Sequence, residues 1–193
     1  MARTRNAARR SGSPSPARRG RRLLIGSGLV GAGLATAAVI LTLAGTVVPS
    51  AKVGADRPAA PAASFRTIDG REVNLADLRG QPVALYFMAS WCGTCVPETQ
   101  AWGQIARDGS VQGLQVFVVD VDPVDSPEGL AGFRDRYVGA GLQWVFDADQ
   151  TLTRAFGVTS LDTTVLIDSL GRVAYRNTVS LSVAQLRQAI AGL

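Results

Sequence analysis

Two cysteines separated by two residues are the feature that most constrains the fold of this chain. Cys92 and Cys95 are its only cysteines, and they follow shortly after the apolar run Val83–Met88. A short run that is apolar at every position is typical of a buried strand covered on both faces. Residues 96–107, after the pair, can form a helix. The sequence therefore places both thiols at a strand-to-helix junction, where they can form a reversible disulfide.

Thiol-disulfide exchange is the chemistry that this spacing favours. A thiolate, rather than a thiol, attacks disulfides, and the free N–H groups and dipole at a helix N-terminus stabilise it. Cys92 sits where such a terminus is expected to begin. Cys95, one helical turn further on, can close a ring with Cys92 and resolve a mixed disulfide with a partner protein.

Three other interpretations of the pair compete with redox chemistry. A structural zinc site made of cysteine alone needs four ligands, whereas the chain has two cysteines and no histidine. A purely structural disulfide over so short a loop would restrain little of the unfolded chain. Two inert buried thiols are the third interpretation, although Gly93 and Thr94 are an unusual insert for a core.

The N-terminal part of the chain predicts a membrane anchor. Residues 1–22 carry eight arginines among Ala, Ser, Gly and Pro, and we expect them to be a disordered tail. Residues 23–48 are 26 consecutive positions without a charge, enough for one transmembrane helix. Arginines before such a helix keep that end in the cytoplasm, so the C-terminal part should be extracytoplasmic. A cleaved export signal, with Val53–Ala55 at the cut, and a buried core helix are the alternatives.

A tether and one folded domain make up the rest of the chain. Residues 49–64 are rich in Pro and Ala and are predicted to be a linker, so we expect the domain to span residues 65–193. From Asp56 onward there are eleven arginines and fifteen acidic residues, a net charge of −4. The folded part is therefore mildly acidic and has no basic cluster, which argues against binding to nucleic acid.

Strand and helix signals alternate along the domain. This alternation predicts an α/β fold with parallel strands and an antiparallel hairpin at the edge of the sheet. Asp69–Gly70 predicts an earlier hairpin turn, and Ser126 and Ser182 predict helix caps. The expected strands are 65–68, 71–75, 83–88, 114–119, 143–146, 163–167 and 173–176, and the expected helices are 96–107, 126–138, 149–156 and 182–191.

The domain resembles the thioredoxin-fold domain of membrane-tethered thiol-disulfide oxidoreductases of the TlpA/ResA-like family. Three segments carry the resemblance, namely Asn74–Pro82, Met88–Glu98 and Phe156–Val173. The resemblance implies a thioredoxin-like α/β sandwich, in which helices flank a central mixed sheet, and it implies no cofactor and no metal.

The resemblance also implies roles for individual residues. Cys92 becomes the exposed nucleophile and Cys95 the buried resolving thiol. Glu98 matches an acid that such proteins place near the pair, where it could relay a proton; the alternative is an ordinary first-turn helix acid. Trp91 would shield the disulfide or simply pack. Trp91 and Thr163, which lies in the strand that faces the disulfide, are candidates for substrate binding.

Two positions depart from the family's pattern. Thioredoxins carry a buried acid six residues before the first cysteine, and here that position is Tyr86, so any proton relay must differ. The family places a cis-proline just before the Thr163–Thr164 pair, and here that position is Asp162, a third candidate for substrate binding. An acid beside Cys92 would disfavour its thiolate and make the pair a weaker oxidant. Alternatively, Asp162 points to solvent in a rearranged turn.

Together these features predict an extracytoplasmic, membrane-anchored thiol-disulfide oxidoreductase. It would exchange disulfides with partner proteins through Cys92 and Cys95, more as a reductant than as an oxidant. A membrane electron donor or acceptor would be its second partner. Two alternatives stay open: a metal-handling or assembly module that uses the two cysteines and Asp162, and a thiol peroxidase in which Cys92 reacts with peroxide.

Overall fold

The computed structural model describes residues 56–109 and 113–193. The predicted cytoplasmic tail, the predicted transmembrane helix and the first part of the tether lie outside these residues. Within the described ranges, no helix combines the length and the apolar character that crossing a bilayer requires.

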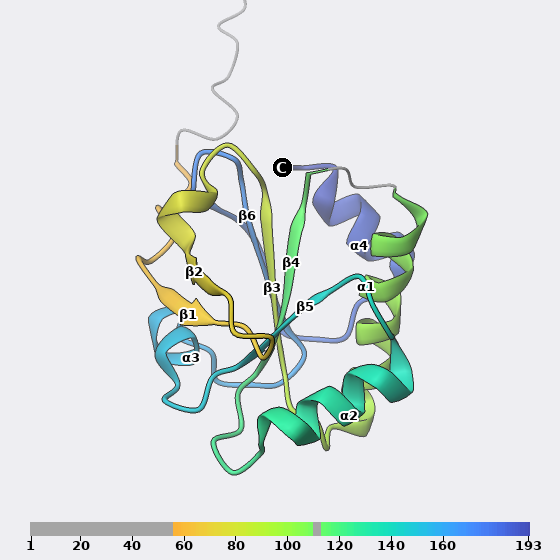
Figure 1. Cartoon of the computed structure of the whole chain (residues 1–193). Helices are drawn as coiled ribbons and strands as arrows, with labels where there is room; N and C mark the ends of the chain where they lie inside the picture. The colour runs from red at the N-terminus through yellow and green to blue at the C-terminus, as the bar shows by residue number, and fades with distance from the viewer. Residues whose placement is uncertain (1–55, 110–112) are drawn as a thin grey trace, which may run out of the picture. The chain divides into compact units, whose positions relative to one another are not determined.

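A five-stranded mixed sheet forms the centre of the domain, with the strand order β5-β4-β3-β6-β7 (Figure 1). Strands β3, β4 and β5 are parallel, β6 is antiparallel to β3, and β7 is antiparallel to β6. The predicted parallel strands and the antiparallel hairpin at the edge are thus confirmed. The strands are β3 (Val83–Met88), β4 (Gln115–Asp120), β5 (Gln143–Phe146), β6 (Thr163–Ile167) and β7 (Val173–Asn177).

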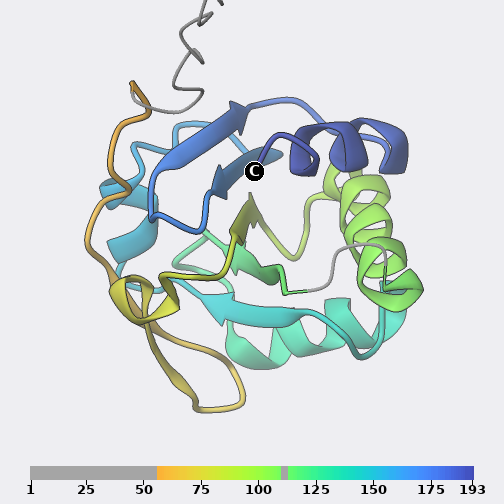
Figure 2. The ribbon, with the colours of Figure 1, turned by 90° about the horizontal axis from the view of Figure 1, so that it is seen from above.

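Helices and a small hairpin cover the two faces of this sheet (Figures 1 and 2). One face packs against α1 (Val96–Asp108), α2 (Pro127–Tyr137) and α4 (Val183–Ile190). The other face packs against the antiparallel hairpin β1 (Ser64–Arg66) and β2 (Glu72–Asn74), the 3-10 helix η1 (Leu75–Leu78) and the short helix α3 (Thr151–Ala155).

The apolar run in β3 is explained by this three-layer arrangement. Ala84, Tyr86 and Met88 point into the core that contains α1, whereas Leu85 and Phe87 point into the core under the hairpin. All six residues of β3 are buried. The strand is therefore covered on both faces, as its sequence predicts.

Local sequence signals set the starts of two helices. The Ser126 side chain accepts a hydrogen bond from the Gly129 N–H at the start of α2. Ser182 and Gln185 form a reciprocal capping box at the start of α4. Both predicted caps are confirmed, and each satisfies N–H groups that a helix start would otherwise leave without a partner.

The segment just before the hairpin is part of the domain and not a free tether. The Val173 N–H donates to the Pro58 carbonyl, and the Ala60 N–H donates to the Gly171 carbonyl. Ala63 is buried beneath the hairpin. Contacts with the domain therefore begin near Arg57 and not at Phe65, because this segment pairs along the edge at the β6–β7 turn.

Close packing of α1 generates a first prediction. A Cβ atom added at Gly103, in the buried face of α1, would lie 2.6 Å from Cγ1 of Val138. Gly103→Ala should therefore lower the free energy of unfolding by about 1 to 3 kcal/mol through overpacking. Denaturant unfolding measures this change.

Gly132→Ala in α2 is the matched control, because no atom lies within 4 Å of the position that its Cβ would take. Alanine has the higher helix propensity, so this variant should gain up to about 1 kcal/mol. Equal effects of the two substitutions would contradict the packing argument.

Candidate active site

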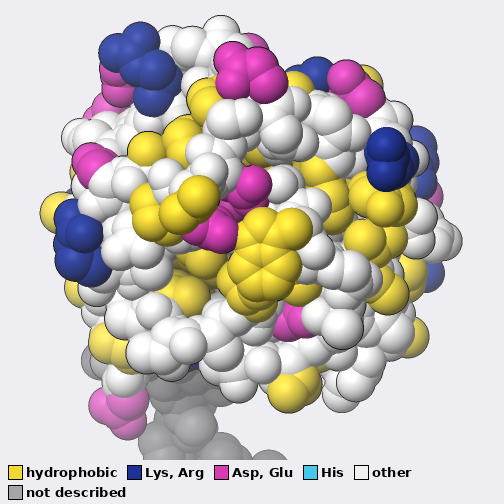
Figure 3. Space-filling view, turned by 90° about the horizontal axis from the view of Figure 1, so that it is seen from below, with side chains coloured by type: hydrophobic (Ala, Val, Ile, Leu, Met, Phe, Trp, Pro, Cys, Tyr) yellow, Lys and Arg dark blue, Asp and Glu magenta, His cyan; other side chains and the backbone are white. Residues whose placement is uncertain are grey.

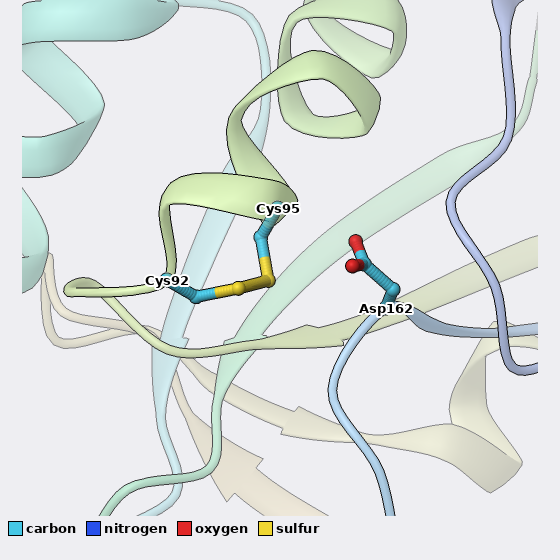
Figure 4. Close-up of side chains that lie close together, drawn as sticks. All are labelled: Cys92, Cys95 and Asp162. Atoms are coloured by element: carbon cyan, nitrogen blue, oxygen red, sulfur yellow. A yellow bond between two sulfur atoms is a disulfide. The ribbon is translucent and has the colours of Figure 1, made fainter.

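The cysteine pair lies in the segment that connects β3 to α1, and the two sulfurs are joined in a disulfide (Figure 4). Cys92 precedes the short 3-10 helix η2 (Gly93–Cys95), which runs directly into α1. The Cys92 N–H donates to the Ala89 carbonyl at 3.0 Å, and the Cys95 N–H donates to the Cys92 carbonyl at 3.1 Å. Two consecutive turns thus bring the cysteines together, as their spacing predicts.

Cys95 is buried as expected, whereas Cys92 is more buried than the sequence suggested. Cys95 has no exposed surface and Cys92 is 5% exposed. The expectation of an exposed Cys92 is therefore wrong for the disulfide form, because the Ala89 turn folds Cys92 back onto the core. Trp91 is 65% exposed, and its indole N–H donates to Asp122 Oδ2 at 2.6 Å. Cys92 remains the more accessible of the two sulfur-bearing residues.

Asp162 faces the disulfide from the loop that precedes β6 (Figure 4). A carboxylate oxygen of Asp162 and the sulfurs of Cys92 and Cys95 all lie within 4.8 Å of one another. The backbone of Asp162 is left-handed, with φ at +56°, a conformation that aspartate tolerates better than most residues. Its side chain accepts a hydrogen bond from the Tyr86 hydroxyl at 2.7 Å. The alternative in which Asp162 points to solvent is therefore wrong.

Tyr86 connects Asp162 to the start of α1. Its hydroxyl lies 2.7 Å from Asp162 Oδ1 and 3.1 Å from the Cys95 carbonyl oxygen, and both are acceptors. Burial of the ring, together with the hydrogen bond to Asp162, raises the pKa of Tyr86 far above its usual value. Tyr86 therefore stays protonated and acts as a hydrogen-bond donor. It occupies the position where thioredoxins carry an acid, but it cannot act as that acid.

Glu98 is fully buried in the first turn of α1. Its Oε1 accepts from the Thr164 hydroxyl at 2.5 Å, and its Oε2 accepts from the Leu181 N–H at 2.7 Å. Burial raises the pKa of Glu98 to about 7; its two hydrogen bonds oppose this rise, whereas the charge of Asp162 adds to it. Glu98 thus lies three residues after Cys95, but it does not belong to the compact group formed by Cys92, Cys95 and Asp162.

Thr163 does not reach the surface. Its side chain is fully buried, and its hydroxyl donates to the Ser160 carbonyl at 2.7 Å. This bond closes the loop that carries Asp162. The side chain of Thr163 therefore shapes the site from within and leaves no exposed atom for a substrate to contact.

Asp120 and Asp125 are site residues to which sequence reasoning gave no role. Asp120 ends β4 and is fully buried, and the Ser90 N–H donates to its Oδ2 at 3.2 Å and to Asp125 Oδ2 at 3.1 Å. Burial, together with the neighbouring Asp125, raises the pKa of Asp120 to about 7. The signal was present in the sequence, because Asp120 directly follows the predicted strand 114–119, one of the strands expected to be parallel to 83–88. These two carboxyls hold the backbone that leads into Trp91.

The surface around the disulfide is apolar and acidic. The loops at 89–95, 121–126, 147–150, 157–162 and 178–182 all lie at the edge of the sheet where β3 ends, and they contain five aspartates and no Lys or Arg. Figure 3 shows this face, with apolar and acidic side chains near its centre and basic side chains toward its margin. Exposed apolar residues on these loops include Trp91, Val124 and Val179.

Cys92, Cys95 and Asp162 also form the one group of His, Cys, Asp or Glu side chains in the described ranges that is compact enough to surround an ion. In the disulfide, each sulfur is bonded to the other and is no thiolate ligand. The arrangement seen here is therefore that of a redox disulfide with an adjacent carboxylate.

A Cys-x-x-Cys disulfide at the end of the central strand, before the helix that packs on the sheet, defines a thioredoxin-like thiol-disulfide oxidoreductase. Residues 57–176 match the AhpC/TSA family, and the chain belongs to this family. Within it, the chain is a thiol-disulfide oxidoreductase of the ResA type. The predicted fold, family and enzyme class are confirmed.

Relatives and solved structures support this assignment. The chain is 30% identical over 129 residues to the thiol-disulfide oxidoreductase ResA of Geobacillus thermodenitrificans, a match that covers 67% of this chain and 72% of the relative. It is 30% identical over 114 residues to ResA of Bacillus subtilis, covering 59% and 62% respectively. The structure of DsbF from MTB aligns with a TM-score of 0.62 at 26% identity, covering 70% of this chain and 97% of that one.

The buried acids generate a prediction about pH. The pKa of Glu98 is raised from 4.5 to about 7 in the folded domain, so between these values the folded state holds a proton that the unfolded chain has lost. The contribution of Glu98 to stability is therefore fully present below pH 4.5 and is lost as the pH rises toward 7. The raised pKa of Asp120 also lowers stability as the pH rises toward 7.

Urea unfolding of the oxidised protein at a series of pH values between 5 and 8 measures this effect. Glu98→Gln should flatten this decline by on the order of 2 kcal/mol, because the glutamine side chain has no proton to lose in this pH range. A decline as steep as in the parent protein would contradict the role given to Glu98.

Proposed function

We propose that this chain is a membrane-anchored, extracytoplasmic thiol-disulfide oxidoreductase that reduces disulfides in partner proteins. Cys92 attacks the partner's disulfide, and Cys95 resolves the mixed disulfide and leaves the Cys92–Cys95 disulfide. A membrane protein then supplies the electrons that regenerate the dithiol. The ResA relatives support the thiol exchange. The extracytoplasmic location of the domain, the direction of electron flow and the membrane electron donor are proposed here from the sequence and from the site.

The N-terminal sequence supports the location. Residues 23–48 are uncharged, eight arginines precede them, and a Pro/Ala-rich segment separates them from the domain. Arginine on the N-terminal side of an apolar helix keeps that side in the cytoplasm. An extracytoplasmic location also suits the proposed substrates, because disulfides in partner proteins form and persist outside the cytoplasm.

The carboxylate of Asp162 is the observation that carries the proposed direction. It lies within 4.8 Å of both sulfurs, and no Lys or Arg occurs in the five loops at this edge of the sheet. A negative charge beside the pair disfavours a thiolate, and an oxidant is strong only when its reduced form is stabilised. The N-terminus of α1 partly offsets this effect. The balance favours the disulfide form, and therefore favours the reducing direction.

The reduction potential tests the direction. Equilibrated against glutathione, the full chain in detergent should have a potential nearer to the value of about −270 mV typical of thioredoxin than to the value of about −120 mV typical of a strong oxidant. Asp162→Asn removes the charge and should raise the potential by about 30 mV or more, a tenfold change in the equilibrium constant.

Asp149→Asn, at an exposed aspartate of the same edge, is the control and should leave the potential unchanged. A potential near about −120 mV in the parent chain would contradict the reducing role.

Thiol labelling tests the location. In a Cys95→Ser variant, Cys92 is the only thiol of the chain. A membrane-impermeant maleimide added to intact cells should label Cys92 to the same extent before and after lysis. The variant that lacks both cysteines is the control for background labelling. Labelling that requires lysis would place the domain in the cytoplasm.

A further inference from the structure

We propose that Asp162 is a catalytic residue of the exchange reaction: its carboxylate accepts the proton of the Cys95 thiol as Cys95 attacks the mixed disulfide at Cys92. This inference rests on the proposed thiol exchange through these cysteines, and it assigns the proton acceptor that this exchange needs. It holds for either direction of electron flow, because the same proton returns to Cys95 in the reverse step.

Burial of Cys95 creates the need for an acceptor. Cys95 has no exposed surface, so bulk water does not reach its sulfur in the disulfide form. The thiolate is the attacking species, and a buried thiol that is to attack must therefore lose its proton to a group inside the site. A positioned side chain that takes such a proton typically accelerates a step by about 100- to 10,000-fold.

Asp162 is positioned to accept this proton. One of its carboxylate oxygens lies within 4.8 Å of the Cys95 sulfur, a separation that one water molecule or a small movement on reduction can close. Figure 4 shows the carboxylate directed at the disulfide on the side of Cys95. Tyr86 holds Oδ1, and among residues 56–109 and 113–193 no hydrogen bond to Oδ2 is seen. Oδ2 is therefore available for the proton.

The other ionisable groups near the pair are less well placed. Both oxygens of Glu98 are engaged by Thr164 and Leu181, and neither belongs to the group within 4.8 Å of the sulfurs. The Tyr86 hydroxyl is a donor and stays protonated. Asp120 is engaged by the backbone N–H groups of Ser90 and Asp122, at the loop that leads into Trp91. Asp162 is therefore the acceptor that the geometry favours.

The reaction balances with this assignment. The Cys92 thiolate attacks the partner's disulfide, forms a mixed disulfide and releases one partner thiolate. The Cys95 S–H bond then breaks, with its proton passing to Asp162, and the Cys95 sulfur attacks the Cys92 sulfur. The Cys92–Cys95 bond forms as the bond between Cys92 and the partner breaks. The second partner thiolate takes the proton from Asp162 or from water, so the partner gains two electrons and the enzyme pair loses two.

Tyr86 is a positioning residue in this scheme. Its hydroxyl ties Asp162 Oδ1 to the segment that carries the Cys95 carbonyl. The acid of this site is thus Asp162, in the loop before β6. Tyr86, six residues before Cys92, donates the hydrogen bond that orients this acid. Loss of this hydroxyl should weaken the effect of Asp162 without removing the carboxylate.

Two-phase kinetics with a nitrobenzoate disulfide, whose released thiolate is coloured, test the assignment. The reduced full chain should release the first coloured thiolate when Cys92 attacks, and the second when Cys95 resolves the mixed disulfide. Asp162→Asn should slow the second phase by about 10- to 100-fold and change the first by less than about threefold. Asparagine can still accept the Tyr86 hydrogen bond and tolerates the left-handed backbone.

Controls separate catalysis from structure. Added imidazole should accelerate the second phase of Asp162→Asn in proportion to its concentration, because an external base replaces the missing acceptor, whereas it should not accelerate the parent chain. Tyr86→Phe should slow the second phase by a smaller factor, and Asp149→Asn should change neither phase. Asp162→Gly, which suits the positive φ, repeats the test if the asparagine variant does not fold.

The outcomes distinguish this inference from the proposed function. A second phase at the parent rate in Asp162→Asn, or a slow phase that imidazole does not accelerate, would overturn the role of Asp162 and leave thiol exchange intact. Slowing in Glu98→Gln but not in Asp162→Asn would assign the proton to Glu98 instead. Failure of the parent chain to release either thiolate would overturn the thiol exchange itself.

Discussion

The hydrogen bonds of the Tyr86 hydroxyl hold together the three segments that form the redox site. Tyr86 lies in the central strand, and its hydroxyl contacts the Cys95 carbonyl at the start of α1 and the Asp162 carboxylate in the loop before β6. The ring is fully buried, so these polar partners are needed to offset the cost of removing the hydroxyl from water. The position of Asp162 beside the disulfide depends on this contact.

The site differs electrostatically from one built to be a strong oxidant. Such an oxidant stabilises its reduced thiolate, whereas here a carboxylate lies within 4.8 Å of both sulfurs and the surrounding loops contain no Lys or Arg. Two further buried acids, Glu98 and Asp120, have pKa values raised to about 7. Glu98 lies three residues after Cys95, and Asp120 accepts a hydrogen bond from the N–H of Ser90, two residues before Cys92. These two buried carboxyls therefore contact the backbone segments on either side of the cysteine pair or lie within them.

Much of the fold was predictable from local sequence, because its signals are local. The apolar run of β3, the caps at Ser126 and Ser182 and the Cys-x-x-Cys spacing each determine structure within a few residues. The burial of Glu98 was not predictable, since it depends on Thr164 and on Leu181, which lie 66 and 83 residues further along the chain. The same holds for Asp162, whose direction is set by Tyr86, 76 residues away. The sequence identified Asp162 as unusual, but only the tertiary contact shows that it faces the sulfurs.

Asp162 and the disulfide act as one chemical unit, and the proposed proton transfer in the exchange reaction depends on this claim. Carbon-13 NMR of the chain labelled at its aspartate carboxyls, recorded at neutral pH in the oxidised and the reduced forms, tests this claim most directly. We predict that the Asp162 carboxyl resonance moves on reduction, because its neighbour changes from a disulfide to two thiols, while the resonance of exposed Asp149 stays in place. An Asp162 resonance that is the same in both forms would contradict the claim.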